Sequence, residues 1–198
     1  MIEEFQNMVP RIGRKVLIAD DALVLGDVIV GDDTGIWFQC VIRGDVNWIE
    51  IGSRVNIQDK CCLHVTNGKW PMLIEDEVSV AHNVMLHGCT IRRGALVGMS
   101  STVMDGAEIG EDCVVAAGTL VREGFKAPPG TLVAGWPKAE VKGDVNQKQK
   151  SIAAQIWPRY VGYKDLYVQE GWEYATPNAA EGSHRFPRGT AESNTGAS

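Results

Sequence analysis

The sequence predicts an all-β solenoid of short parallel strands, followed by a C-terminal α-helix. Three observations predict this fold: an aliphatic residue returns every six positions, small or β-branched residues recur four places after it, and both patterns stop after Pro137. A period of six fits neither an α-helix, whose period is about 3.6, nor a simple amphipathic strand, whose period is about 2. It is typical of a hexapeptide solenoid, in which each hexad forms one strand and one corner.

The aliphatic repeat defines the predicted core. Its members are Ile18, Val24, Val30, Ile36, Ile42, Ile51, Ile57, Leu63, Ile74, Val80, Leu86, Ile91, Val97, Val103, Ile109, Val115, Val121, Ala127 and Val133. Three strands close one triangular coil of about 18 residues, so the repeat predicts roughly six coils stacked about 4.8 Å apart. At the corners we expect glycines with backbone angles that other residues avoid; these are Gly26, Gly31, Gly52, Gly98, Gly110 and Gly118.

Three of the five cysteines occupy the small-residue slot of the repeat. Cys40, Cys61 and Cys113 each lie four places after an aliphatic position, and we interpret them as apolar filler at tight corners. Cys62 and Cys89 lie outside the slot, and the pattern assigns them no role. An odd number of cysteines without a Cys-x-x-Cys pair favours a reducing compartment over a disulfide framework.

Charge and hydropathy exclude several classes of function. The net charge of −6 and the pI near 5.2, without a basic run, argue against nucleic acid as a partner. Residues 1–14 contain acids and lack a long apolar stretch, so we do not interpret them as a signal peptide. No segment reaches the roughly 18 apolar residues of a membrane span. We therefore expect a cytoplasmic protein that binds neither nucleic acid nor membrane.

The six-residue spacing is interrupted at three places. After Ile42, Leu63 and Leu86 the gaps are nine, eleven and five residues. The two longer gaps predict loops pushed out of the solenoid, one of them over residues 66–72 with Trp70 and Pro71 near its tip. Such interruptions commonly carry function, because the regular coils pack without them.

The remainder of the chain divides into two segments. We predict a solenoid over residues 1–137, a helical segment over 138–175 and a disordered tail over 176–198, which contains His184. Within the second segment, Asp144 to Glu170 is predicted to be helical, with Pro158 kinking or splitting the helix. A stripe of larger residues should pack on the solenoid: Ile152, Ile156, Tyr160, Tyr163 and Tyr167.

Counting strands places two histidines in one column. When the strands are assigned in turn to faces a, b and c, Leu63 and Leu86 begin successive strands of face b. His64 and His87 directly follow them and should point outward, with Cα atoms near 5 Å apart. Two imidazole nitrogens, each about 2.0 Å from a zinc ion, fit that separation. Arg43 occupies the same column one coil earlier.

A third histidine lies on another face. His82 follows Val80 by two places on face a, with Asp59 beneath it, and within one chain it cannot easily reach the face-b pair. A threefold assembly, in which face b of one subunit meets the face-a corner of the next, uses all three histidines. The same docking sets Arg43 opposite Asp59 of the neighbouring subunit, where a salt bridge is expected.

Several segments resemble the motifs of the γ-class carbonic anhydrases in identity and order: Arg43-Gly44-Asp45, Asn56-Ile57-Gln58-Asp59, His64 and His82-Asn83-Val84-Met85-Leu86-His87-Gly88-Cys89. Over residues 14–137 the repeat also resembles the hexapeptide-transferase superfamily. The resemblance implies a left-handed parallel β-helix that assembles as a homotrimer. It implies His64, His82 and His87 as metal ligands, Gln58 as a partner of the metal-bound water, and Arg43, Asp45 and Asp59 as ties between subunits. Asn56 matches the motif without a defined role.

The implied activity is hydration of CO₂ to bicarbonate by a metal-bound hydroxide. The metal would be zinc, with iron or cobalt also compatible with imidazole ligands. The best-known family members place a glutamate after the Arg-Gly-Asp segment as a proton shuttle, and here that residue is Val46. Two other classes stay open: a metal-dependent acyl-CoA thioesterase or other acyl-group enzyme, and a non-catalytic metal-bound trimeric scaffold.

Overall fold

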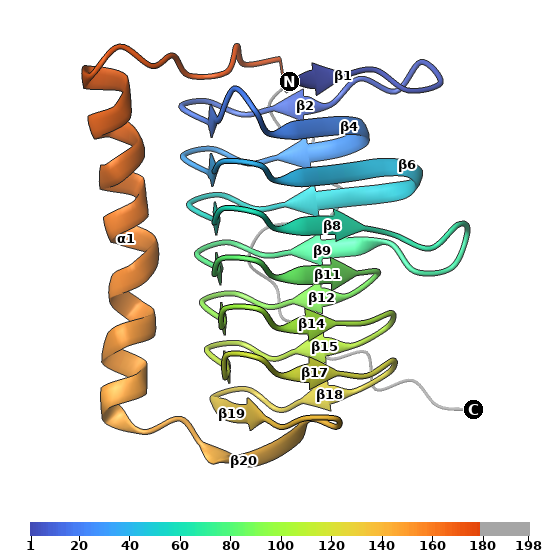
Figure 1. The fold of residues 1–198 in the computed structure, drawn as a ribbon, viewed down its shortest axis with the longest axis vertical. Helices are drawn as coiled ribbons and strands as arrows, with labels where there is room; N and C mark the ends of the chain where they lie inside the picture. Colours follow the sequence, from blue (N-terminus) through green and yellow to red (C-terminus); the bar gives the residue numbers. More distant parts are fainter. Residues whose placement is uncertain (179–198) are drawn as a thin grey trace.

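The computed structural model describes residues 1–178. They form a left-handed parallel β-helix with one C-terminal helix running along its side (Figure 1), as the sequence predicts. The rest of the predicted tail, residues 179–198 with His184, lies outside the described part of the chain.

Face a is an 8-stranded sheet that contains one strand from each coil and one additional strand at its C-terminal end. Its strands are β3 (Leu17–Ile18), β5 (Gly35–Ile36), β7 (Asn56–Ile57), β10 (Ser79–Val80), β13 (Leu96–Val97), β16 (Val114–Val115), β19 (Thr131–Ala134) and β20 (Glu140–Asp144). All pairs are parallel except the last, in which β20 folds back antiparallel on β19. Without β20 the sheet has seven strands, so the solenoid has seven coils, and the estimate of roughly six was one too low.

Faces b and c join into a 12-stranded sheet, because β4 and β6 run through the corner between them. The N-terminal members are β1 (Ile2–Glu3), β2 (Arg11–Ile12), β4 (Leu23–Val30) and β6 (Val41–Ile51). Face b continues with β8 (Cys62–His64), β11 (Met85–His87), β14 (Thr102–Val103) and β17 (Leu120–Val121), and face c with β9 (Met72–Ile74), β12 (Thr90–Ile91), β15 (Glu108–Ile109) and β18 (Lys126–Ala127).

The aliphatic repeat fills the interior of the solenoid, as predicted. Its members from Val24 to Val133 are at most 6% exposed, and Ile12 extends the series one hexad earlier. Only Ile18 is partly buried, at the edge of the core. The corner cysteines are buried too, and so is Cys89. Because burial raises the pKa of Cys89 to about 12, its thiol is a packing group rather than a nucleophile.

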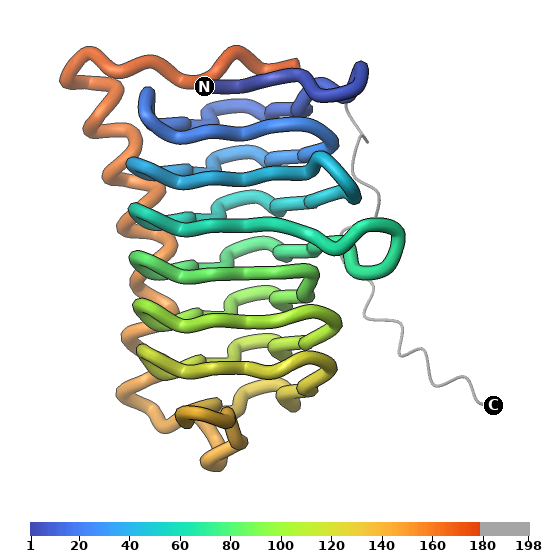
Figure 2. Tube along the Cα trace, turned by 45° about the vertical axis from the view of Figure 1, so that its right-hand side comes forward, coloured from blue at the N-terminus to red at the C-terminus, as the bar shows by residue number. Residues whose placement is uncertain are grey.

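The two longer insertions behave differently. Residues between Ile42 and Ile51 do not form a loop, contrary to the prediction, because β6 is continuous and pairs with β4 across a register shift near Gly26. The insertion after β8 does project from the stack, at the right of Figures 1 and 2. A backbone bridge between Thr66 and Trp70 closes this loop.

Glycine is needed at the corners for two physical reasons: a positive φ, which the sequence predicted, and close approach of the neighbouring coil, which it did not. Gly26 and Gly118 adopt positive φ values of 82° and 70°. At Gly31 and Gly52 the reason is space, because a Cβ atom would lie 2.5 Å from atoms of the next coil along the chain.

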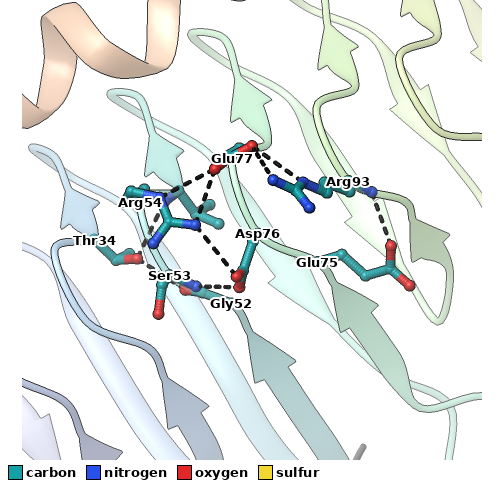
Figure 3. Close-up of polar contacts among 9 residues, drawn as sticks. Thr34, Gly52, Ser53, Arg54, Glu75, Asp76, Glu77 and Arg93 are labelled. Carbon is teal, nitrogen blue, oxygen red and sulfur yellow. Dashed lines mark hydrogen bonds and ion pairs between the residues drawn. The ribbon is translucent and has the colours of Figure 1, made fainter. Parts of the chain in front are cut away.

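Ion pairs link side chains of successive coils on the outside of the solenoid (Figure 3). Arg54 donates to Glu77 Oε1 at 2.9 Å, and Arg93 donates to Glu77 Oε2 at 3.0 Å. Asp76 Oδ1 also accepts from the backbone N–H of Ser53 at 2.8 Å. Burial alone would raise the pKa of Glu77, but the hydrogen bonds from the two arginines outweigh it and hold that pKa below its usual value.

Helix α1 (Gln147–Gln169) covers face a, where it contacts β5, β7 and β10. It begins at Gln147 rather than Asp144, because Asn146 and Gln149 form a capping box there. Pro158 lies inside the helix without splitting it. The predicted stripe is partly wrong, since Ile152 and Tyr163 are 48% and 47% exposed.

Two sets of contacts hold the helix in place: two tyrosines of the predicted stripe, which do pack on the solenoid, and a buried lysine that the stripe did not predict. Tyr160 and Tyr167 pack edge-on against Trp37, with ring centroids 5.4 and 5.2 Å apart. Lys164 is fully buried, and its ammonium donates to Asp33 at 3.2 Å and to Asp165 at 2.6 Å. The packed face can hold a lysine because carboxylates pair its charge.

After α1 the chain returns to the N-terminal end of the solenoid. The backbone N–H of Ala175 donates to Val16 at 2.8 Å, and that of Asn178 donates to Ile12 at 2.9 Å. Residues 176–178, expected to be disordered, are therefore held against the first coil and satisfy part of its open edge. Among the described residues, no helix is long and apolar enough to cross a membrane.

Candidate metal site

The strand register brings His64 and His87 together on face b. In the pairing of β8 with β11, Leu63 lies opposite Leu86 and His64 opposite His87. In the pairing of β6 with β8, Ile42 lies opposite Leu63, which sets Arg43 before His64 in the same outward column. The predicted column of one arginine and two histidines is confirmed.

The two imidazoles face each other across a short gap. Their ring centroids are 5.1 Å apart, and Nδ1 of His64 lies 3.1 Å from Nε2 of His87. An ion about 2.05 Å from both nitrogens would see them at an angle of about 100°, close to tetrahedral. The pair therefore fits two of the ligands of a zinc-like metal.

Each imidazole is also bound to a carboxylate on its far side. His64 Nε2 lies 3.1 Å from Asp45 Oδ1, and His87 Nδ1 lies 2.7 Å from Asp105 Oδ1. A carboxylate only accepts hydrogen bonds, so these ring nitrogens carry the protons and the two facing nitrogens present lone pairs. Two lone pairs 3.1 Å apart repel each other unless a cation or a proton lies between them. This donor set suits a metal ion.

The Asp45 carboxylate lies between two hydrogen-bond donors of its own chain. It accepts from Arg43 as well as from His64. Desolvation would raise the pKa of Asp45, but hydrogen bonds from Arg43 and His64 outweigh it and lower that pKa. Asp45 is therefore suited to stay ionised beside the histidine pair.

His82 lies at the edge of face a, apart from this pair. Asn56 and Ile57 pair with Ser79 and Val80, and this register stacks Asp59 on His82 as predicted. His82 Nδ1 is 2.8 Å from Asp59 Oδ2, which leaves Nε2 as the available nitrogen. Across residues 1–178, no group of three or more metal-binding side chains gathers within the single chain.

Gln58 and Asn56 form a buried hydrogen-bonded chain on face a. Gln58 Nε2 donates to Asn56 Oδ1 at 3.0 Å, and Asn56 Nδ2 donates to Ser79 Oγ at 2.8 Å. Both side chains are at most 4% exposed. Since the amide nitrogen of Gln58 is engaged, its Oε1 is the atom left to accept a further hydrogen bond.

Sequence reasoning missed Asp105, which contacts His87. Counting coils could have found it, because Leu86 pairs with Val103 and the residue two places later therefore lies beside Gly88. Asp105 also accepts from the Thr66 hydroxyl, with both oxygens 3.1 Å away. The loop after His64 has no carboxylate of its own, yet the fold brings one to it.

The proposed shuttle position remains without a carboxylate. Val46 lies in β6 and is 40% exposed. Another acid does approach the loop, since Glu123 lies 3.9 Å from Lys69, but its side chain is 62% exposed. Such an exposed pair contributes little to holding the loop.

Several known proteins are similar to this chain. A family model described as "Bacterial transferase hexapeptide (six repeats)" matches residues 88–123. The chain is 43% identical over 177 residues to Protein YrdA of Escherichia coli (strain K12), covering 86% of this chain and 96% of YrdA. It is 47% identical over 142 residues to a carbonic anhydrase of Geobacillus kaustophilus (strain HTA426), covering 72% of this chain and 78% of that protein.

More distant similarity extends to plants, and a solved structure shares the fold. Gamma carbonic anhydrase 2, mitochondrial, of Arabidopsis thaliana is 37% identical over 166 residues, covering 81% of this chain and 59% of that protein. A crystal structure from Bacillus cereus, described as a putative acetyltransferase, superposes with a TM-score of 0.83 and 42% identity. The match covers 86% of this chain and 98% of that one.

Proposed function

Since this chain belongs to the γ-carbonic-anhydrase-like family of hexapeptide-repeat proteins, we propose that it is a metalloenzyme that hydrates CO₂ to bicarbonate. Its metal would be zinc, or alternatively iron or cobalt, bound where two subunits of a homotrimer meet. The observation that carries this proposal is the face-b histidine pair, whose facing nitrogens lie 3.1 Å apart.

A trimer supplies the third ligand. His64 and His87 come from one chain, and His82 is the most exposed of the three, with 41% of its side chain accessible. The outward column of face b beside the pair is apolar, with Val41 and Met85 37% and 40% exposed. Exposed apolar surface of this kind favours burial against a second subunit, and in the proposed trimer a ring of three such contacts would bury it on every chain.

The metal, when bound, would supply Lewis acidity that makes water nucleophilic near neutral pH. The protein's part is orientation: Asp45 and Asp59 each accept the far N–H of one imidazole and so hold its ring. Gln58, whose amide nitrogen donates to Asn56, offers Oε1 to accept a hydrogen bond from the attacking water.

Each hydration also releases a proton that must leave the site. Val46 cannot accept it, because its side chain is a hydrocarbon. We therefore propose that buffer molecules carry much of the proton flux.

Acyl-group chemistry is a second candidate. The observation that favours it is the similarity to the Bacillus cereus protein described as a putative acetyltransferase. A thioesterase or acyltransferase would use the metal that the same histidines hold to polarise the carbonyl of an acyl group rather than CO₂.

Purification without chelators, followed by metal analysis and stopped-flow CO₂ hydration, tests the proposal. We expect about one metal per chain and measurable hydration, both lost in His87→Ala. His184→Ala is the matched control, since we assign that histidine no ligand role. A metal-loaded protein that turns over acetyl-CoA but not CO₂ would favour the acyl-group alternative, and one active on neither would leave a metal-bound scaffold.

A further inference from the structure

The loop between β8 and β9 contacts the metal site through Asp105. Thr66, at the start of the loop, donates its hydroxyl to both carboxylate oxygens of Asp105 at 3.1 Å. One of the same oxygens lies 2.7 Å from Nδ1 of His87. A loop residue, an aspartate from two coils further on and an expected ligand thus form one hydrogen-bonded chain.

Glycine makes this approach possible. A Cβ atom on Gly88 would overlap the Asp105 carboxylate and would lie 2.7 Å from Cβ of Trp70. A side chain there would therefore displace either the carboxylate or the loop.

The loop itself is packed rather than free. The ring of Trp70 lies on Gly106, where a Cβ atom would meet it at 2.8 Å. Asn47 donates its side-chain amide to the Thr66 carbonyl at 3.0 Å. Thr66 is therefore held by the coils on either side of it and can in turn fix Asp105.

We propose that Asp105, held by Thr66, positions His87 for metal binding by keeping the proton on Nδ1 and leaving Nε2 free. The chemistry requires such a choice, because a neutral imidazole has one protonated nitrogen and only the other can ligate. Nε2 is the nitrogen that faces His64, so the Nδ1–H tautomer is the competent one. The inference rests on the proposed metal site, and it gives the loop a positioning role.

The chain offers a matched control at another corner. The Asp112 carboxylate lies against Gly94 in the same way that the Asp105 carboxylate lies against Gly88. In both cases a carboxylate oxygen occupies the space that a Cβ atom on the glycine would take. That corner belongs to face c, away from the histidines. Asp112→Asn therefore alters a similar corner carboxylate without touching the site.

The test uses the full-length protein in two measurements. In metal-free protein with isotope-labelled histidine, NMR spectra of the ring nitrogens report the tautomer of His87. The signals of His87 are identified because they disappear in His87→Ala. We expect Nδ1–H in the wild type and in Asp112→Asn, and a shift towards Nε2–H in Asp105→Ala. If the alanine variant does not fold, Asp105→Asn takes its place. Its side-chain oxygen still accepts a hydrogen bond from Nδ1–H of His87, so we expect the tautomer to stay the same, but the loss of the negative charge should weaken zinc binding.

Zinc affinity, measured by competition with a chromogenic chelator, is the second readout. Loss of such a carboxylate typically lowers metal affinity by about 10- to 100-fold, and we expect a loss in this range for Asp105→Ala. Thr66→Val, which removes only the hydroxyl, should lose less, and Asp112→Asn should lose none. These comparisons need no catalytic activity.

The outcomes separate the inference from the proposed function. An unchanged tautomer and unchanged zinc affinity in Asp105→Ala would overturn the inference while leaving the metal site intact. Unchanged affinity with reduced CO₂ hydration that imidazole restores would also overturn it, because Asp105 would then move protons. A wild type that binds no zinc would reject the proposed metal site, and the tautomer spectra would still test the hydrogen bond.

Discussion

Mixing two inactive variants should restore activity if each metal site is shared between subunits. His64 and His87 lie together on one chain, with facing nitrogens 3.1 Å apart, whereas His82 lies on another face beside Asp59. Homotrimers of His64→Ala and of His82→Ala should therefore each lose all three sites. In a mixed trimer, a site is complete where a chain with an intact pair meets a chain with an intact His82.

The expected recovery follows from the cyclic arrangement. When the two variants are unfolded, mixed equally and refolded, each chain is of either kind with a probability of about one half. At a given site, the chain that supplies His64 and His87 has both of them intact in about half of the cases, and the chain that supplies His82 has it intact in about half. The site is therefore complete with a probability of about one quarter. Bound zinc and CO₂ hydration should both recover to about a quarter of the wild-type values.

A second mixture provides the control. His64→Ala mixed with His87→Ala should recover nothing, because every chain lacks one member of the pair. Recovery in this control but not in the test mixture would overturn the assignment of His82 as the residue that crosses. If neither mixture recovers although mass spectrometry detects mixed trimers, the shared site itself is rejected.

Three further predictions concern proton transfer, assembly and acid stability. Because Val46 carries no ionisable group, imidazole buffer should raise CO₂ hydration turnover until it saturates, and a buffer-independent rate in stopped flow would point to another proton acceptor. Arg43→Met should weaken the trimer by roughly 3 kcal/mol per interface, since we expect Arg43 to pair with Asp59 of the next subunit; an undiminished trimer in sedimentation would contradict this. The folded-state pKa of Glu77 lies below its usual value, so its stabilising contribution is present above the unfolded value of about 4.3 and disappears as the pH falls through the folded value. Glu77→Gln should remove this part of the pH dependence in urea denaturation, and an identical acid profile for both proteins would refute it.

The sequence by itself determined the solenoid and the columns on its faces. A period of six sets each strand directly above the one three hexads earlier, so the register of one residue determines that of its neighbours. For this reason counting strands set His64 opposite His87 and Asp59 beneath His82. The same counting failed only at the number of coils and at β6, where inserted residues continued the strand.

Other features depended on contacts that the period does not encode. The helix stripe was partly wrong because Lys164 takes a core-facing position, which carboxylates outside the stripe make tolerable. A pattern of apolar spacing cannot identify such a residue, since its burial depends on charged partners outside the pattern, one of which, Asp33, lies far away in the chain. The return of Asn178 to the first coil is likewise a long-range contact.

Only the tertiary structure decided how the histidines are oriented. The repeat determines where the backbone of His87 lies, but its tautomer depends on Asp105, and the position of Asp105 depends on Thr66 in a loop outside the repeat. The physical reason is that backbone stacking sets the strands at one spacing, whereas hydrogen bonds between side chains depend on rotamers and on the path of the loop.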